Sequence, residues 1–261
     1  MAKLTANGVT LAYDDVGGGD PPFVFIHGLA CNRSFWALQV ENLGRDFRCV
    51  NVDLRGCGDS PAVPPFDMST AADDVAALIT ALGLDRPIVV GHSLGGLVCL
   101  LLNDRHPELV RGIVLADAPL NHARAGFDDM VEAITDEGSM GALAMTIESF
   151  FVEETASDIQ DQVRMTMLTC PPDVAAGMLS NSGVFTTGLD DLIKKADRKP
   201  FMTIWGGRPL GDPDHLRDIT MFVRQEPMVG SGHFFQLEQP AITNALLRAF
   251  VDDVRWDPRI T

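Results

Sequence analysis

The pentapeptide Gly91-His92-Ser93-Leu94-Gly95 constrains this chain more than any other stretch. It follows a short β-branched run, residues 88–90, typical of a buried strand, and it precedes a largely apolar segment, residues 94–103, long enough for a buried helix. A sharp strand-to-helix turn brings backbone into contact on both sides of its central residue, so glycine is needed at the flanking positions. The turn exposes the strained Ser93 at the N-terminus of the helix, where backbone N–H groups favour developing negative charge. The pattern therefore predicts a nucleophilic serine.

The rest of the chain alternates between apolar runs typical of strands and segments typical of helices. Further strands are predicted at residues 9–13, 23–26, 47–52, 112–116 and 201–205, and helices at residues 35–43, 70–82 and 241–254. Strands that alternate with helices imply a mostly parallel sheet covered by helices on both faces. The predicted fold class is therefore α/β.

Residues 121–190 interrupt this alternation. They contain no strand-like run, they indicate short helices, and they are rich in Met and Phe: Met130, Met140, Met145, Met165, Met167, Met178, Phe150, Phe151 and Phe185. We interpret this stretch as a helical cap inserted into a core domain made of residues 1–120 and 191–261. The Met and Phe side chains are expected to pack the cap against the core, and some of them to wall an adaptable apolar pocket.

Composition and charge exclude several classes of partner. The formal net charge is −16 and the isoelectric point is about 4.6, which disfavours nucleic acid and anionic membrane surfaces. The five cysteines are odd in number, and their spacing matches neither a disulfide framework nor a metal site. The N-terminus lacks an apolar signal segment, and no stretch is long enough to span a bilayer. We expect a cytoplasmic protein with free thiols, no metal and no cofactor; no pattern predicts an oligomeric state.

Four features taken together resemble the α/β-hydrolase fold over nearly the whole chain apart from the cap. They are the turn at Ser93, the pair His27-Gly28 at the end of a strand, the loop of residues 53–60, and the late segment Gly230-Ser231-Gly232-His233. Members of this family are mostly serine esterases, lactonases, C–C bond hydrolases and relatives with altered nucleophiles. The resemblance implies a mostly parallel central sheet flanked by helices, with the helical cap inserted.

The resemblance also implies a role for particular residues. Ser93 matches the nucleophile, and His233 matches the histidine that removes its proton. The backbone N–H groups of Leu29 and Leu94 match the oxyanion hole. His27 is expected to fix loop geometry, and the side chain of His92 to point away from Ser93.

The triad acid has two candidates. In most of the family it follows the strand that here spans residues 201–205, where this chain has Pro209 in place of the acid; Asp212 and Asp214 come a few positions later. A branch resembling haloalkane dehalogenases takes its acid from the end of the preceding strand, at the spacing that separates Asp117 from Ser93. We favour Asp117 and keep Asp212 as the alternative, although many family members carry a non-catalytic aspartate at the first position.

The resemblance predicts a cofactor-free serine hydrolase that cleaves a carboxylic ester or lactone through an acyl-enzyme. The alternatives are a cofactor-free oxygenase that uses a His–Asp pair, a C–C bond hydrolase, and a non-catalytic small-molecule receptor. Serine at the nucleophile position argues against haloalkane dehalogenase or epoxide hydrolase chemistry. The Met- and Phe-rich cap predicts a small-molecule substrate that is largely apolar and ester-like.

Overall fold

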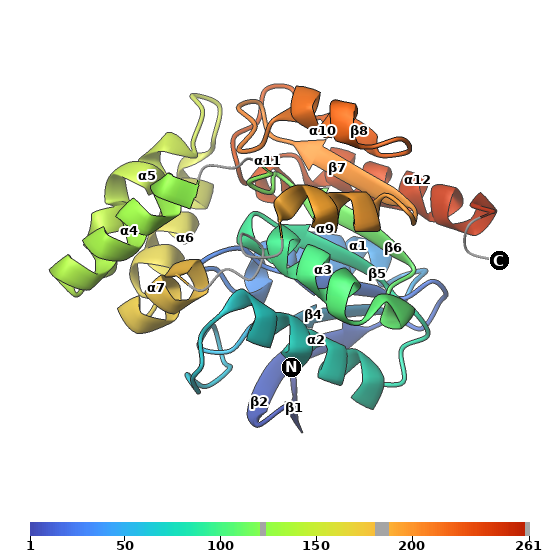
Figure 1. Ribbon diagram of the computed structural model, residues 1–261, viewed down its shortest axis with the longest axis horizontal. Helices are drawn as coiled ribbons and strands as arrows, with labels where there is room; N and C mark the ends of the chain where they lie inside the picture. Colours follow the sequence, from blue (N-terminus) through green and yellow to red (C-terminus); the bar gives the residue numbers. More distant parts are fainter. Residues whose placement is uncertain (121–123, 181–187, 259–261) are drawn as a thin grey trace.

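The structure is a computed structural model that describes residues 1–120, 124–180 and 188–258 (Figure 1). An eight-stranded sheet runs through it in the order β1-β2-β4-β3-β5-β6-β7-β8. Strands β1 and β2 pair with their neighbours in antiparallel fashion, and all later pairs are parallel. The strands are β1 (Ala2–Ala6), β2 (Val9–Val16), β3 (Phe23–Ile26), β4 (Cys49–Val52), β5 (Ile88–His92), β6 (Gly112–Ala116), β7 (Phe201–Trp205) and β8 (Arg224–Pro227). The mostly parallel sheet predicted from the sequence is confirmed.

The two edge strands were not among the strands predicted from the sequence. β1 and β8 lie at opposite edges of the sheet. β8 has the sequence Arg-Gln-Glu-Pro, and its side chains are partly or fully exposed. An edge strand pairs on one side only and can carry charge and proline, so it lacks the apolar run that marks a central strand. By contrast, every residue of β3, β5, β6 and β7 is buried.

Successive strand residues pack against the helices on opposite faces of the sheet, because side chains alternate across a strand. In β5, Val89 belongs to the core beneath α2 (Met68–Ala81), α3 (Leu94–Arg105) and α9 (Leu189–Ala196). Ile88 and Val90 belong to the core beneath α1 (Ala37–Leu43) and α12 (Pro240–Trp256). Figure 1 shows α2, α3 and α9 in front of the sheet, with α1 and α12 behind it. The short elements are η1 (Arg33–Trp36), η2 (Pro107–Leu109), α10 (Pro213–Ile219) and α11 (Phe235–Glu238).

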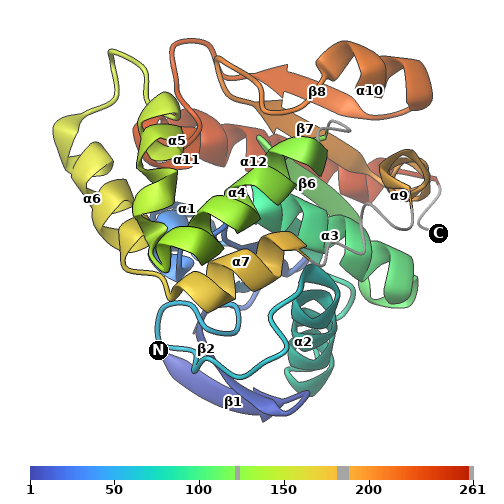
Figure 2. The ribbon, with the colours of Figure 1, turned by 60° about the vertical axis from the view of Figure 1, so that its left-hand side comes forward.

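The described helical elements between β6 and α9 form a separate group beside the sheet (Figures 1 and 2). We call them the helical layer: α4 (Arg124–Glu137), η3 (Met140–Leu143), α5 (Ala144–Ser149), α6 (Ser157–Leu168) and α7 (Pro172–Ser180). Helices were expected in this stretch. That residues 121–190 form a cap separate from the core domain stays a prediction. Within the described ranges, no helix is long and apolar enough to cross a membrane.

The Met residues of the helical layer do not all pack as expected. Met140, Met167 and Met178 are buried, but Met145 and Met165 are 85% and 71% exposed. α5 and α6 each turn one face outward, and these two side chains lie on those outward faces, so composition alone overestimated their packing role. Phe185 lies outside the described residues.

Candidate active site

Ser93 occupies the turn between β5 and α3, and its backbone is strained as the pentapeptide predicts. Its φ and ψ are 52° and −123°, a conformation that is costly for a residue with a side chain. Its N–H donates to the carbonyl oxygen of Ala116 in the neighbouring strand β6 (2.8 Å), which fixes the turn. A Cβ at Gly91 would collide with the Gly95 carbonyl, and one at Gly95 would collide with the His27 carbonyl. Both glycines are therefore needed for steric reasons.

His233 and Asp117 form a buried pair at the carboxyl edge of the sheet. His233 lies in the loop before α11, and Asp117 directly follows β6. The His233 Nδ1 and Asp117 Oδ2 atoms are 2.7 Å apart, and both side chains are almost fully buried. Since a carboxylate only accepts, Nδ1 carries the proton, which leaves Nε2 as the acceptor in the neutral ring.

Asp117 is held in place by two further donors. Its Oδ1 atom accepts hydrogen bonds from the N–H groups of Gly206 (3.2 Å) and Leu210 (3.3 Å), in the loop after β7. Its own N–H donates to the carbonyl oxygen of Ile204 (2.7 Å). The carboxylate therefore has partners on both oxygens, and its orientation toward His233 is determined by the backbone around it.

Asp212, the alternative acid, does a different job. It is exposed at the N-cap of α10, where its Oδ1 accepts from the N–H groups of Asp214 (3.1 Å) and His215 (3.0 Å). A carboxylate at this position satisfies helix N–H groups that have no partner within the helix. Of the two candidate acids, Asp117 is the one hydrogen-bonded to His233.

Leu29 and Leu94, whose N–H groups are the predicted oxyanion hole, both line the cavity at Ser93. Leu94 is the first residue of α3, where an N–H has no partner within the helix. Leu29 follows Gly28, and an added Cβ at Gly28 would lie 3.2 Å from the Cβ of Ser93. No hydrogen bond among the described residues uses either N–H. Two donors are thus available next to Ser93.

His27 ties together the ends of two strands. Its Nδ1–H donates to the Gly28 carbonyl (2.8 Å), and its Nε2 accepts from the N–H of Leu54 after β4 (3.0 Å). Burial lowers the pKa of His27, so it stays neutral, as both contacts require. This geometry matches the loop-fixing role expected of it.

The prediction that His92 points away from Ser93 is wrong. The ring of His92 lies 4.5 Å from the ring of His233, centroid to centroid, and it lines the same cavity as Ser93. Its Nε2–H donates to the His233 carbonyl (3.0 Å), whereas its buried Nδ1 has no partner among the residues that the structure describes. Burial, reinforced by the nearby His233, lowers the pKa of His92 well below its usual range. Because side chains alternate along β5, His92 shares the face of Val90, which is the face toward the His233 loop.

The loop of residues 53–60 is held by two arginines. Asp53 accepts from the backbone N–H of Arg33 (2.7 Å) and pairs with its guanidinium. Arg55 forms a buried bidentate pair with Asp74, with both N–O distances at 2.6 Å. These charged groups bind one another and not the cavity, so their role is to fix the loop.

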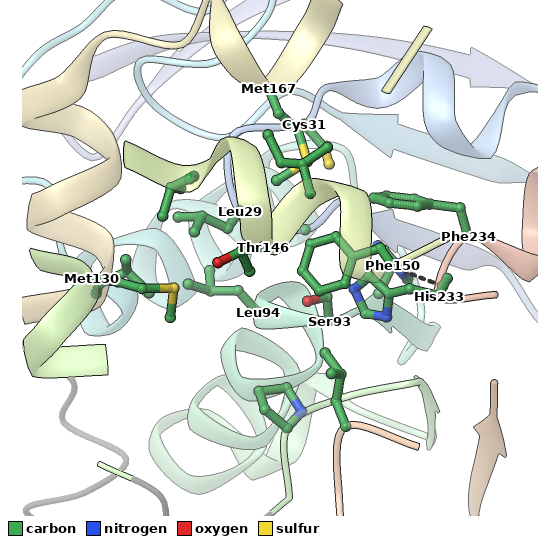
Figure 3. Close-up of a pocket in the computed structure, with 17 residues that line it drawn as sticks. Leu29, Cys31, Ser93, Leu94, Met130, Thr146, Phe150, Met167, His233 and Phe234 are labelled. Carbon is green, nitrogen blue, oxygen red and sulfur yellow. Dashed lines mark hydrogen bonds between the residues drawn. The ribbon is translucent and has the colours of Figure 1, made fainter. Parts of the chain in front are cut away.

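A cavity of about 220 Å³ lies between Ser93 and the helical layer. Figure 3 shows Ser93 and His233 facing it together, with Phe150 beside the histidine ring. Most of its lining is apolar, and Thr146 adds a hydroxyl: the lining includes Leu29, Leu94, Met130, Leu143, Thr146, Ile147, Met167 and Leu179. The site therefore suits a largely apolar small molecule with one polar group at Ser93.

Phe150, one of the side chains expected to pack the cap or wall a pocket, lines the cavity and also contacts His233, which the sequence did not predict. Its carbonyl oxygen accepts the N–H of His233 (2.9 Å), and its ring centroid lies 4.5 Å from that of His233. The helical layer thus positions the His233 loop as well as covering the cavity. An aromatic residue in a Met-rich helical stretch carries no signal that distinguishes this contact from ordinary packing.

Comparisons with known proteins identify the family and the fold. The alpha/beta hydrolase fold family matches residues 21–240. The chain is 29% identical to the AB hydrolase superfamily protein YisY of Bacillus subtilis, over 94% of this chain and 97% of that protein. It superposes with a TM-score of 0.84 on a thermophilic esterase from Thermogutta terrifontis (25% identity, 97% of this chain, 98% of that chain). It superposes equally well, at 0.84, on Est816, described as an N-acyl homoserine lactone degrading enzyme (25% identity, 95% of this chain, 100% of that chain).

Proposed function

Because this chain belongs to the alpha/beta hydrolase fold family, we propose that it hydrolyses a carboxylic ester or lactone through an acyl-enzyme, with Ser93, His233 and Asp117 as its catalytic triad. The observation that carries this proposal is the buried His233–Asp117 pair, 2.7 Å apart, in which His233 lines the same cavity as the strained Ser93. Relatives named as an esterase and a lactone-degrading enzyme support the choice of bond.

In the first half-reaction, Ser93 Oγ attacks the carbonyl carbon of the substrate while His233 Nε2 takes the hydroxyl proton. Asp117 keeps the proton on Nδ1 and stabilises the imidazolium that forms. Collapse of the tetrahedral intermediate breaks the bond to the leaving alkoxide, which receives the proton from His233. In the second half-reaction, water is activated by His233, attacks the acyl group, and releases the carboxylic acid and free Ser93.

The N–H groups of Leu29 and Leu94 hold the oxyanion of both tetrahedral intermediates. Each such donor is typically worth about 3 kcal/mol of transition-state stabilisation. Leu94 adds the positive end of the α3 dipole, since it is the first residue of that helix. Backbone donors place no demand on the side chain, which is why leucine is acceptable at both positions.

The apolar lining supplied by the helical layer supports a substrate with a largely apolar, medium-sized acyl or alcohol group. Thr146 of α5 is one of the residues that line the cavity (Figure 3). We assign it as a hydrogen-bonding partner for one polar atom of the substrate away from the reacting carbonyl.

Activity-based labelling tests the proposal directly. A fluorophosphonate should add covalently to Ser93, which is located by peptide mass mapping, and the label should vanish in Ser93→Ala. The wild type should hydrolyse p-nitrophenyl esters and acyl lactones, and Ser93→Ala should lose at least about 10³-fold in kcat. If the folded wild type shows no labelling and no hydrolysis, the proposal is refuted. Oxygen consumption with a hydroxylated heteroaromatic that survives Ser93→Ala would instead favour the cofactor-free oxygenase.

A further inference from the structure

A second cavity adjoins the one at Ser93 and brings three cysteines together. Its volume is about 490 Å³, and it lies between the loop after β4 and the turn from α6 to α7. Cys57 comes from the loop and Cys170 from the turn, while Cys31 lines both cavities. Cys170 is more than a hundred positions from Cys31 and from Cys57 in the chain, and only the packing of the helical layer on the core brings it to them.

The core loop and the helical layer are in direct contact at this place. A Cβ added at Gly56 would lie 2.6 Å from Val174 Cγ2 of α7, and one added at Gly177 would lie 2.5 Å from the carbonyl oxygen of Phe66. There is no room for a side chain at either glycine. The backbone of the core loops therefore packs directly against α7. Cys57 is the residue after Gly56 and Cys170 precedes α7, so both lie next to this contact and line the same cavity.

Cys57 and Cys170 both line this cavity, and their thiols differ in reactivity. The Cys57 thiol donates a hydrogen bond to the sulfur of Cys170, which lowers the pKa of Cys170 and raises that of Cys57. Cys170, when protonated, donates to the carbonyl oxygen of Pro171 (3.6 Å). Cys170 is partly exposed to solvent, while Cys57 is buried. Burial raises the pKa of Cys31 and Cys99. Exposure and thiolate character make Cys170 the sulfur that an oxidant attacks first.

We propose that Cys57 and Cys170 form a redox-active pair, in which Cys170 is oxidised first and Cys57 resolves it to a disulfide that joins the helical layer to the core. With hydrogen peroxide as oxidant, the Cys170 thiolate attacks one peroxide oxygen and becomes a sulfenic acid, while hydroxide leaves. The Cys57 sulfur then displaces the sulfenic hydroxyl, which leaves as water. In sum, two thiols and one peroxide give one disulfide and two waters.

The disulfide would restrain the α6–α7 turn against the loop of residues 53–60. It closes a loop of more than a hundred residues, so it constrains the unfolded chain strongly. We expect the melting temperature of the oxidised protein to rise by roughly 5 °C or more, and dithiothreitol to reverse the rise. Separation of the helical layer from the core next to the Ser93 cavity would be restricted in the oxidised form.

The test treats the reduced, full-length protein with a small excess of hydrogen peroxide, removes the oxidant, and counts thiols after denaturation. The count should fall from five to three, with a mass loss of about 2 Da and a cross-linked peptide pair that contains Cys57 and Cys170. In Cys57→Ser, Cys170 should stop at the sulfenic acid and be trapped by dimedone. In Cys170→Ser, all remaining thiols should survive. Cys49→Ser is the matched control and should form the disulfide as the wild type does, because Cys49 is buried elsewhere, beside the Phe47 carbonyl.

Peptide mapping of the wild type decides the proposal even if a serine variant does not fold. A disulfide between any other pair, disulfide-linked dimers on a non-reducing gel, or five thiols left intact would overturn it. None of these readouts uses catalytic activity, so the result does not depend on the proposed hydrolase function.

Discussion

Asp117→Asn should abolish most activity by reversing the tautomer of His233. Asn has one accepting oxygen and one donating amide group in place of two accepting oxygens. The Oδ1 position faces two donors, the N–H groups of Gly206 and Leu210, so the Asn oxygen must take it. The amide NH₂ then faces His233 Nδ1 at the position of Oδ2. His233 can satisfy that donor only by accepting at Nδ1, which places its proton on Nε2.

A proton on Nε2 prevents His233 from accepting the proton of Ser93. The loss in kcat for such a tautomer reversal is about 10³–10⁴-fold, which corresponds to roughly 4–5.5 kcal/mol in the activation free energy. The effect on folding should be much smaller, because Asn keeps hydrogen bonds at both ends; replacing a charged acceptor by a neutral group costs about 1–2 kcal/mol.

The assay is kcat for a p-nitrophenyl ester, with folding checked by the urea midpoint. Asp212→Asn is the matched control, since it makes the same chemical change a few residues away. Asn is as good an N-cap as Asp, so this variant should keep activity within about twofold. If Asp117→Asn keeps activity within tenfold while Asp212→Asn loses it, the assignment of Asp117 as the acid is wrong.

Three further outcomes follow from particular contacts. Burial lowers the pKa of His92 below its usual 6.5, so the unfolded chain binds the His92 proton more readily than the folded chain does. The free energy of unfolding should therefore decrease as the pH is lowered through 6.5, and His92 should account for about 1.4 kcal/mol of the decrease at pH 5.5. Urea unfolding of His92→Gln, compared at pH 7.5 and 5.5, should lack this part of the decrease. Arg55→Met should lower the free energy of unfolding, measured with urea, by about 3–5 kcal/mol, because it leaves the buried carboxylate of Asp74 without its partner. The double variant Arg55→Met/Asp74→Leu should recover part of this loss. No recovery would contradict the ion-pair explanation. Met167→Trp should lower kcat/KM for an octanoate ester at least about tenfold more than for an acetate ester, because Met167 lines the cavity. Met165→Trp, on the exposed face of α6, should change kcat/KM for neither ester. If Met167→Trp affects both esters equally, the cavity does not hold the acyl chain.

The sequence determined the features that depend on a few neighbouring residues. The collision that a Cβ at Gly91 or Gly95 would cause is a property of the turn itself and the strand beside it, so the pentapeptide was enough to predict the strained Ser93. Continuous apolar runs marked the central strands, because these strands are buried on both faces. The edge strands β1 and β8 lack that signal, since one side of each faces solvent.

Only the tertiary structure decided which distant groups meet. Asp117 and Asp212 were both compatible with the spacing, and what separates them is that β6 ends beside the His233 loop whereas Asp212 caps an exposed helix. The tertiary structure also brings Phe150 to His233, and Cys57 to Cys170. Steric and periodic rules act over a few residues, whereas these contacts depend on how a whole sheet and a helical layer pack together.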